Sequence, residues 1–401
     1  MQPFQISMPS LRAKRRVQQM QQQALEERVS LIDVLGKPTP EPSSRRSTSN
    51  KLPVQEPWTM RRLMRYLSLT AVSAMVTFFL LGRESKALHW QQFNQLLEPQ
   101  LKTVQSQRCY SERRHGQHQK CTCPDPSIPL QNPDKEWKKH HTRLVEDAKR
   151  APKKLDIVFL GDEIIEQWNG TADMGTTILK GDMREPFEKR FTTKGGGTLE
   201  GIALGSSIDT GPNLLWHIQN GLITNIDPKI WFLSVGTNDL FQEKCTDRFV
   251  VASILNVVKM IHDLKPNAVF IIHGILPRKD NPKSKSQFLK KNWKYAQTIN
   301  TQIRKFCEHS PRLYYMQAGP LFLEETESKG RRQIAEELLK DGIHPTRKGL
   351  EVWGDYIVKR VRQILREIEE QRSAGLKGTS RAMLSLLPTN ESFVNGTIPS
   401  Y

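Results

Sequence analysis

Short apolar runs alternate with longer amphipathic stretches through the second half of this chain. The apolar runs, which have the length of buried strands, lie at residues 155–161, 201–205, 230–235, 268–274 and 312–316. The stretches with helical spacing lie near residues 211–222, 246–263, 286–307 and 346–370. Strands that alternate with helices in this way predict a parallel sheet with helices on both faces, which is a three-layer doubly wound α/β fold. In such a sheet the functional loops lie beyond the carboxyl ends of the strands.

The first 150 residues have a different pattern. They are rich in Gln, Arg, Pro and Ser and show no sustained core periodicity, so we expect mainly disordered segments there. The exception is the uncharged run 66–82, which Arg65 and Arg83 enclose. As a helix it would span about 25 Å, enough to cross a thin bilayer. Because it follows a long polar segment and has no small-residue cleavage site, we interpret it as an uncleaved signal anchor rather than a signal peptide.

These patterns divide the chain into five segments. We expect a cytosolic basic tail (1–65), a transmembrane anchor (66–82), a lumenal stem (83–152), the α/β domain (153–370) and a disordered C-terminal tail (371–401). Basic residues are denser before the apolar run than after it, which places the N-terminus in the cytosol. The chain is then a single-pass type II membrane protein of the Golgi or endoplasmic reticulum, with its domain in the lumen.

Cysteines and glycosylation sequons agree with this topology. All five cysteines follow the apolar run, which suits an oxidising compartment. Three sequons also follow it, with Asn169, Asn390 and Asn395 as the acceptor residues.

A group of cysteines and histidines in the stem is a candidate metal cluster. Its members are Cys109, His115, His118, Cys121 and Cys123. Their spacing matches no zinc-finger pattern, and lumenal cysteines usually oxidise, so a stem disulfide or an intermolecular bridge explains them better. The odd cysteine count leaves open a disulfide-linked dimer through the stem. We expect no metal and no cofactor.

The formal net charge of +18 does not by itself indicate a nucleic-acid partner. No nucleic-acid-binding motif accompanies it, and the basic residues are spread over the tail, the stem and the helices of the domain. A tail that lies on anionic lipid explains the N-terminal part of this charge. The lumenal part suits a glycan or lipid ligand, and we expect no nucleic acid.

Four sequence blocks carry the candidate chemistry. The first is the strand that ends in Gly161-Asp162-Glu163, and the second is the segment 201–210 with the helix that follows it. The third ends in Gly236-Thr-Asn238-Asp239, and the fourth is Asp341-Gly-Ile-His344. In this order the blocks resemble those of the SGNH, or GDSL, esterase and lipase superfamily, whose fold is flavodoxin-like. The amino-acid sequences of the second and third blocks are especially similar to those of the alpha subunits of intracellular platelet-activating-factor acetylhydrolase.

The resemblance implies a role for several side chains and exposes three departures. His344 would be the general base, Asp341 its orienting carboxylate, and Asn238 a donor in the oxyanion hole, with the backbone amide of Ile208 as another. Relatives carry a nucleophilic serine where this chain has Glu163. They also carry glycine at the position of Ile208, and asparagine at the position of Ala203.

A carboxylate at the nucleophile position changes the chemistry. It attacks an ester poorly and would form an anhydride that readily reverses. We hypothesise that Glu163 occupies the site itself by pairing with His344 and Asn238. Two alternatives keep catalysis: Glu163 could activate water as a general base, or Ser206 or Ser207 could replace the missing hydroxyl.

The sequence therefore leaves two functions open. The first is an ester hydrolase or acyl transferase that acts on O-acylated glycans or lipids, with its activity lost or altered through Glu163. The second is a non-catalytic lumenal binding or scaffold protein that keeps the pocket. The basic segment 275–285 is a candidate lining for the ligand groove in either case.

Overall fold

The computed structural model describes residues 123–280, 289, 291–310, 312–326 and 332–385, with short pieces at 95, 113–114 and 117–118. The transmembrane anchor expected at 66–82 and the N-terminal tail lie outside these residues, as do parts of the stem and of the C-terminal tail. Within the described ranges, no helix is both long enough and apolar enough to cross a bilayer.

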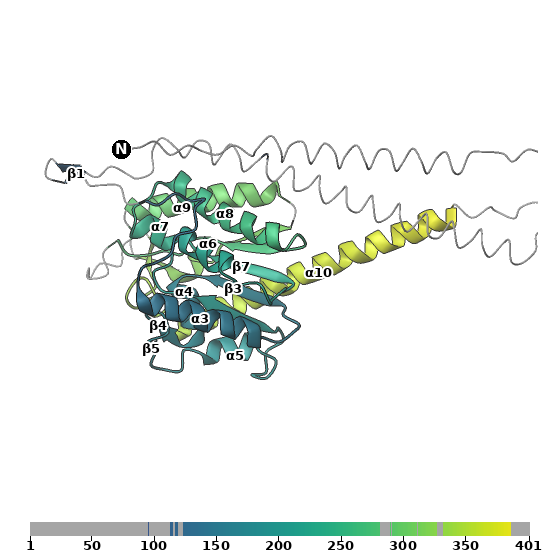
Figure 1. Cartoon of the computed structure of the whole chain (residues 1–401), viewed down its shortest axis with the longest axis horizontal. Helices are drawn as coiled ribbons and strands as arrows, with labels where there is room; N and C mark the ends of the chain where they lie inside the picture. The colour runs from purple at the N-terminus through teal and green to yellow at the C-terminus, as the bar shows by residue number, and fades with distance from the viewer. Residues whose placement is uncertain are drawn as a thin grey trace, which may run out of the picture. The chain divides into compact units, whose positions relative to one another are not determined.

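The centre of the domain is a five-stranded parallel sheet (Figure 1). Its strands are β3 (Ile157–Gly161), β6 (Gly201–Gly205), β7 (Ile230–Ser234), β8 (Phe270–His273) and β9 (Leu313–Met316). They lie in the order β6-β3-β7-β8-β9, and each neighbouring pair is parallel. This is the order of flavodoxin-like doubly wound sheets. The predicted parallel α/β fold is therefore confirmed.

Each strand supplies side chains to two separate cores. In β3, Val158 and Leu160 pack into one core, whereas Ile157 and Phe159 pack into the other. This alternation within a fully apolar strand is typical of a sheet that is covered on both faces. One face carries α6 (Gly211–Gln219), α8 (Asp247–Leu264) and α9 (Lys291–Glu308); the other carries α4 (Glu163–Glu166), α5 (Glu185–Phe191) and α10 (Arg347–Ser385).

Short elements complete the domain. They are β1 (Arg113–Arg114), β2 (Gln117–His118), η2 (Gln167–Asn169), β4 (Thr171–Ala172), β5 (Thr177–Ile178), α7 (Thr237–Phe241), η3 (Gly319–Phe322), β10 (Leu323–Glu325) and β11 (Arg332–Ile334). The strand pairs β1–β2, β4–β5 and β10–β11 form antiparallel hairpins outside the main sheet.

A helix that the sequence did not predict, α3 (Lys135–Arg150), packs at the β6 edge of the sheet. Asp134 caps its first turn by accepting hydrogen bonds from the Glu136 and Trp137 amides. Trp137, Leu144 and two smaller buried side chains face the domain. The expectation that no core-facing element lies before residue 150 is therefore wrong for this helix. The compact domain begins within the range expected to be stem.

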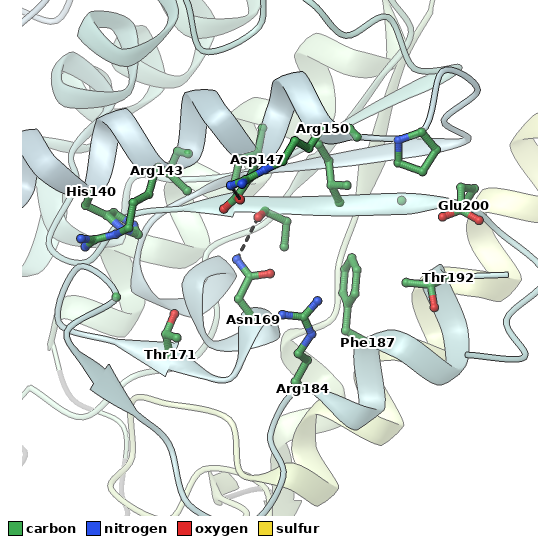
Figure 2. Close-up of a pocket in the computed structure, with 18 residues that line it drawn as sticks. His140, Arg143, Asp147, Arg150, Asn169, Thr171, Arg184, Phe187, Thr192 and Glu200 are labelled. Atoms are coloured by element: carbon green, nitrogen blue, oxygen red, sulfur yellow. Dashed lines mark hydrogen bonds and ion pairs between the residues drawn. The ribbon is translucent and has the colours of Figure 1, made fainter. Parts of the chain in front are cut away.

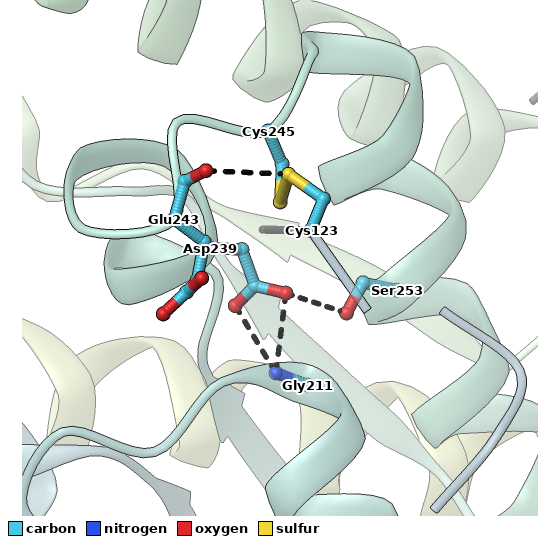
Figure 3. The surroundings of a disulfide bond; sticks show 6 residues. All are labelled: Cys123, Gly211, Asp239, Glu243, Cys245 and Ser253. Atoms are coloured by element: carbon cyan, nitrogen blue, oxygen red, sulfur yellow. Dashed lines mark hydrogen bonds between the residues drawn. A yellow bond between two sulfur atoms is a disulfide. The ribbon is translucent and has the colours of Figure 1, made fainter. Parts of the chain in front are cut away.

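A disulfide joins Cys123 to Cys245 across 122 residues of sequence (Figure 3). It connects the segment that enters the domain to the loop between α7 and α8. The expectation of a bridge within the stem or between chains is therefore wrong for Cys123, because its partner lies in the folded domain. Cys307 is buried and free, and burial raises the pKa of its thiol to about 12.

Candidate functional site

The site lies where β3 ends and the short helix α4 begins. Gly161 closes the strand at a point where a β-carbon would lie 2.0 Å from the carbonyl oxygen of Ser234, so only glycine fits. Asp162 caps α4 by accepting a hydrogen bond from the Ile164 amide at 3.1 Å. Burial raises the pKa of Asp162 well above its usual value, and the adjacent charge of Glu163 adds to this. Glu163 is the first residue of α4, which aims its side chain along the edge of the sheet.

The carboxylate of Glu163 is buried and held by two donors from neighbouring loops. Its Oε2 accepts a hydrogen bond from the Ile208 amide at 3.1 Å and another from Asn238 Nδ2 at 2.8 Å. These are the two groups that the sequence predicts as oxyanion-hole donors. The Glu163 carboxylate therefore occupies the space between these two predicted donors. No hydrogen bond or ion pair joins Glu163 to His344 in the described part of the chain.

Ile208 keeps the loop conformation that a glycine would adopt more easily. Its φ is +64°, in the left-handed region that β-branched residues rarely enter, and its side chain is 45% exposed. This conformation costs about 1 to 2 kcal/mol relative to an ordinary one. The backbone amide nevertheless points at the Glu163 carboxylate. The positive φ of Ile208 therefore leaves its amide in position to donate to Glu163.

A second carboxylate on α4, that of Glu166, stabilises the loop that carries Ser207 and Ile208. It is fully buried and accepts hydrogen bonds from the Ser207 amide at 2.8 Å, the Ser207 hydroxyl at 2.5 Å and the Gly175 amide at 2.5 Å. Glu166 was not identified from the sequence. Its spacing of three residues from Glu163 predicts only that the two side chains share one face of a helix, and it does not predict that Glu166 is buried. Ser207 is therefore engaged in the loop's own support rather than poised beside His344.

Ser206 is also not placed to act as a nucleophile beside His344. It is 1% exposed, and its hydroxyl has no hydrogen-bond partner among the described residues. Neither this serine nor Ser207 forms a hydrogen bond with His344 in that part of the chain. The structure does not bring either proposed surrogate nucleophile to the base.

Asn238 is fixed by contacts on both ends of its amide. Its Nδ2 also donates to the Asp209 carbonyl oxygen at 3.1 Å, and its Oδ1 accepts from Gln242 Nε2 at 2.8 Å. The next residue, Asp239, accepts hydrogen bonds from the Gly211 amide and the Ser253 hydroxyl beside the disulfide (Figure 3). Burial raises the pKa of Asp239 to about 6. The network around Asn238 therefore preorganises this donor.

The base side of the site is intact. His344 Nδ1 lies 2.7 Å from Asp341 Oδ2, while Asp341 Oδ1 accepts hydrogen bonds from the amides of Ile343 and His344. Burial acts to raise the pKa of Asp341, but the hydrogen bonds and the charge of His344 lower it to about 2. Burial acts to lower the pKa of His344, yet the hydrogen bond and charge of Asp341, with the charge of Glu163, raise it above its usual value. The free Nε2 then carries a proton to a higher pH than an isolated imidazole would.

Arg278, from the basic segment 275–285, lies close enough to act on this site. Its guanidinium stacks over the Phe241 ring at 4.9 Å, and its Nε and Nη1 have no hydrogen-bond partner among the described residues. Burial lowers the pKa of Arg278, against the charges of Glu163, Asp162 and Asp341. The arginine therefore partly balances a site that would otherwise carry several adjacent negative charges.

An open cavity of about 410 Å³ lies beside His344 and Asp341. Its other lining residues come from the β4–β5 region and from the approach to α10, and they include Gln167, Leu179, Lys180, Met183, Lys340 and Pro345. The cavity is thus bounded by the retained base on one side and by a mixture of apolar and cationic side chains elsewhere.

A second cavity, of about 430 Å³, lies at the free edge of β6 and away from the catalytic-like residues (Figure 2). Arg143 and Arg150 approach it from α3, and Arg184 approaches it from the opposite wall. Asn169 Nδ2 donates to the Ala203 carbonyl oxygen at 2.9 Å in this cavity. The atom to which an N-glycan would attach at Asn169 is therefore already bonded to the sheet edge. Asn390 and Asn395 lie outside the described residues.

A second aspartate–histidine pair lies deep in the domain. His217 Nε2 is 3.0 Å from Asp209 Oδ2, and both side chains are 1% exposed. Trp137 of α3 donates its indole N–H to Asp209 Oδ1 at 2.6 Å. This pair therefore fastens α3 and α6 to the loop that carries Ile208. In the described ranges, no group of three or more His, Cys, Asp or Glu side chains is arranged to hold a metal ion.

Comparisons with known proteins find one family for this part of the chain. Residues 159–352 match the model of the GDSL-like Lipase/Acylhydrolase family. The chain is 29% identical over 180 residues to a platelet-activating factor acetylhydrolase IB subunit beta homolog of Drosophila melanogaster, covering 45% of this chain and 68% of that protein. It is 26% identical to the alpha1 subunit of the Rattus norvegicus enzyme, covering 54% and 78%.

A solved structure, that of a GDSL-like lipase from Bacteroides thetaiotaomicron, aligns with 57% of this chain and 98% of its own length, at 19% identity and a TM-score of 0.41. The family match begins within β3 and includes β6 to β9, both loops that contact Glu163 and the Asp341–His344 segment. The α/β domain of this chain belongs to the SGNH (GDSL) hydrolase superfamily.

Proposed function

We propose that this chain is an SGNH-hydrolase-like protein whose ester-hydrolysis centre is disabled by Glu163, so that its pocket binds ligand without turning it over. One observation carries the proposal: the Glu163 carboxylate is hydrogen-bonded to both the Ile208 amide and the Asn238 side chain. A bound ester could place its carbonyl oxygen between these donors only by displacing a buried carboxylate.

The retained Asp341–His344 pair supports the view that only the nucleophile has been lost, and not the rest of the catalytic centre. Asp341 and His344 keep the spacing of an orienter and a base. His344 has no serine hydroxyl from which to take a proton, and its raised pKa reduces its fraction in the basic form near neutrality. A protein with this arrangement retains the binding surface of an esterase while lacking its first chemical step.

The direct test is hydrolysis of p-nitrophenyl acetate, a small activated ester, by wild type and by Glu163→Ser, Glu163→Ala and Glu163→Gln. The alanine variant opens the donor pair without supplying a nucleophile, so it separates these two effects. We expect wild type, alanine and glutamine variants to be equally slow, and the serine variant to be at least about 100-fold faster, as a restored nucleophile and base would give.

Two results would overturn this proposal. If wild type is already fast and Glu163→Ser is no faster, the carboxylate does not block the site. If wild type is fast and Glu163→Gln is slow, Glu163 acts as a general base on water instead. Matching thermal unfolding midpoints for the four proteins would exclude misfolding as the cause of any difference.

We also propose that the domain faces the lumen of the secretory pathway, as a type II membrane protein. The Cys123–Cys245 disulfide supports this location, because such bonds persist in oxidising compartments. Treatment of the cell-made protein with an N-glycan-removing enzyme should shift its mobility on a gel. We expect the shift to vanish in Asn390→Gln/Asn395→Gln and to persist in Asn169→Gln, because the Asn169 amide is bonded within the β6-edge cavity. A protein that shows no shift and fractionates with cytosol would contradict the topology.

A further inference from the structure

We infer that the cavity beside His344 is a binding site for a small carboxylate that carries a short apolar chain. This inference names the class of ligand for the proposed binding function and rests on that function, because an active esterase would bind an ester in this space and release its products. The carboxylate would face His344, Lys180 and Lys340, and its chain would lie on the apolar part of the cavity.

The apolar part of the cavity is formed by three side chains. Leu179 follows the β5 strand, Met183 lies on the approach to α5, and Pro345 directly follows His344. The volume of about 410 Å³ falls at the small end of the range for small-molecule sites. A chain of a few carbons fits this surface better than a long acyl chain or a polymer.

The charges on the cavity wall favour an anion. Lys180 and Lys340 are exposed, and neither forms an ion pair with an acid in the described ranges. The one acidic lining residue, Asp341, is already engaged by the His344 ring and two backbone amides. Two uncompensated lysines beside an imidazole therefore make this wall electropositive.

A polar side chain also lines this cavity, that of Gln167, which is 6% exposed. Its amide oxygen is buried without a hydrogen-bond partner among the described residues. The amide nitrogen of the same side chain is the group that can donate to a bound carboxylate. The cavity thus offers one more polar contact than the protein itself fills.

The state of His344 makes binding depend on pH. The groups that act on it are Asp341, Glu163 and Arg278, with Lys180 and Lys340 on the cavity wall. Asp341 and Glu163 hold the pKa of His344 above its usual value against burial and Arg278. The imidazolium that would pair with a carboxylate is therefore present below this raised pKa and lost above it. Affinity should fall as the pH rises through it.

A carboxylate is favoured over a phosphate by the kind of donors present. The cavity offers the ammonium groups of two lysines, the ring N–H of one histidine and the amide of one glutamine, and no arginine is among its lining residues. Doubly charged phosphate is usually recognised by arginine forks or by clustered backbone amides. One negative charge with two oxygens matches this set of donors.

The test is isothermal titration calorimetry of sodium hexanoate into the full-length chain in lipid nanodiscs, with empty nanodiscs as the blank. We expect saturable binding that is at least about fivefold tighter at pH 6 than at pH 8, because one charged partner is lost. Hexanamide, which has the same chain without the charge, should bind at least about tenfold more weakly. Equal binding of hexanamide, no hexanoate binding, or tighter binding of hexyl phosphate would overturn the assignment.

Lysine variants locate the site. Lys180→Ala and Lys340→Ala should each weaken hexanoate binding by about fivefold, as expected for loss of one partly exposed charge contact. Lys194→Ala is the matched control, because Lys194 lines a cavity near β6 instead, and it should change the affinity by less than about twofold. Equal effects of all three variants would show a general charge effect and would overturn the site.

Glu163→Ala separates failure of this inference from failure of the proposed function. Glu163, Ile208 and Asn238 do not line this cavity, so Glu163→Ala should leave the dependence of hexanoate binding on Lys180 and Lys340 in place while it frees the donors of Ile208 and Asn238 for an ester. Rapid ester hydrolysis by wild type would defeat the proposed function, even if binding still depended on Lys180 and Lys340. Loss of that lysine dependence would defeat the inference, even if wild type were inactive.

Discussion

The donor side and the base side of this site differ in what occupies them. On the donor side, the Ile208 amide and Asn238 are both hydrogen-bonded to the Glu163 carboxylate in a buried setting. On the base side, the side chains of Asp341 and His344 remain paired, and they are 50% and 35% exposed. One half of the machinery is filled by the protein itself, whereas the other half is open to a ligand.

The difference shows which parts of a hydrolase site the fold itself maintains. The donor loops are tied into the core by Glu166, Asp209 and Asp239, so their geometry survives whatever the nucleophile becomes. Glu163, which stands at the nucleophile position that the resemblance implies, is by contrast a single side chain at the start of a four-residue helix. Changing it alters the chemistry without disturbing the supporting network.

The largest predicted effect tests whether both sides can still work together. In the Glu163→Ser background, adding His344→Ala should lower the rate of p-nitrophenyl acetate hydrolysis by about 1000-fold, because no base would remain for the serine. His309→Ala is the control, since this exposed histidine at the end of α9 bonds only its own helix. An undiminished rate in the double variant would mean that the restored activity does not use His344.

The next effect tests how the donor side is supported. Glu166→Ala should lower the free energy of unfolding by about 3 to 5 kcal/mol, because several buried N–H and O–H donors lose their acceptor. Urea unfolding followed by tryptophan fluorescence measures this change. Replacing the exposed residue Glu146 by alanine should leave the unfolding midpoint unchanged. A similarly small effect of Glu166→Ala would show that the loop is held by other contacts.

A smaller effect concerns the covalent tie beside Asn238. Cys245→Ser should lower the free energy of unfolding by about 3 kcal/mol through loss of a long closed loop. Cys123→Ser should have the same effect, and the double variant should be no worse than either single one. Wild type in reducing buffer should match the variants. Additive losses would mean that the two cysteines stabilise the domain independently, without a shared bond.

The smallest effect sharpens the view of Ile208. Ile208→Gly should raise the free energy of unfolding by about 0.5 to 1 kcal/mol, because glycine adopts the observed positive φ without strain. Ile178→Gly is the matched control: this exposed isoleucine lies in β5 with no positive φ, so glycine should destabilise there. Equal losses at both positions would show that Ile208 is not strained in solution.

The sheet and the four-block site were predictable because their signals are local. Uninterrupted apolar runs gave the five strands to within about two residues at each end, since a buried parallel strand tolerates few polar positions. Glu163, Ile208 and Asn238 were found from short blocks that follow three of those strands, and His344 from a block that lies just before α10. The structure brings the first three into direct contact and leaves His344 nearby, joined to Asp341 instead of Glu163.

The remaining features depend on contacts between distant segments. The buried stripe of α3 includes His140 and Ala148 beside Trp137 and Leu144, so its apolar pattern is weak in the sequence. The pairing of Cys123 with Cys245 could not be deduced, because five cysteines allow many combinations. A glutamate on a short helix is normally expected at the surface. The burial of Glu166 follows only from the contact of its helix with the Ser207 loop, which the sequence does not predict.

The carboxylate at residue 163 also bears on how this protein can be detected. Fluorophosphonate reagents label hydrolases by phosphonylating an activated serine, and Glu163 stands where the family resemblance would place that serine. If the proposed function is right, surveys that enrich enzymes with such reagents should not recover this chain. Its abundance has to be followed by antibodies or by direct peptide measurement.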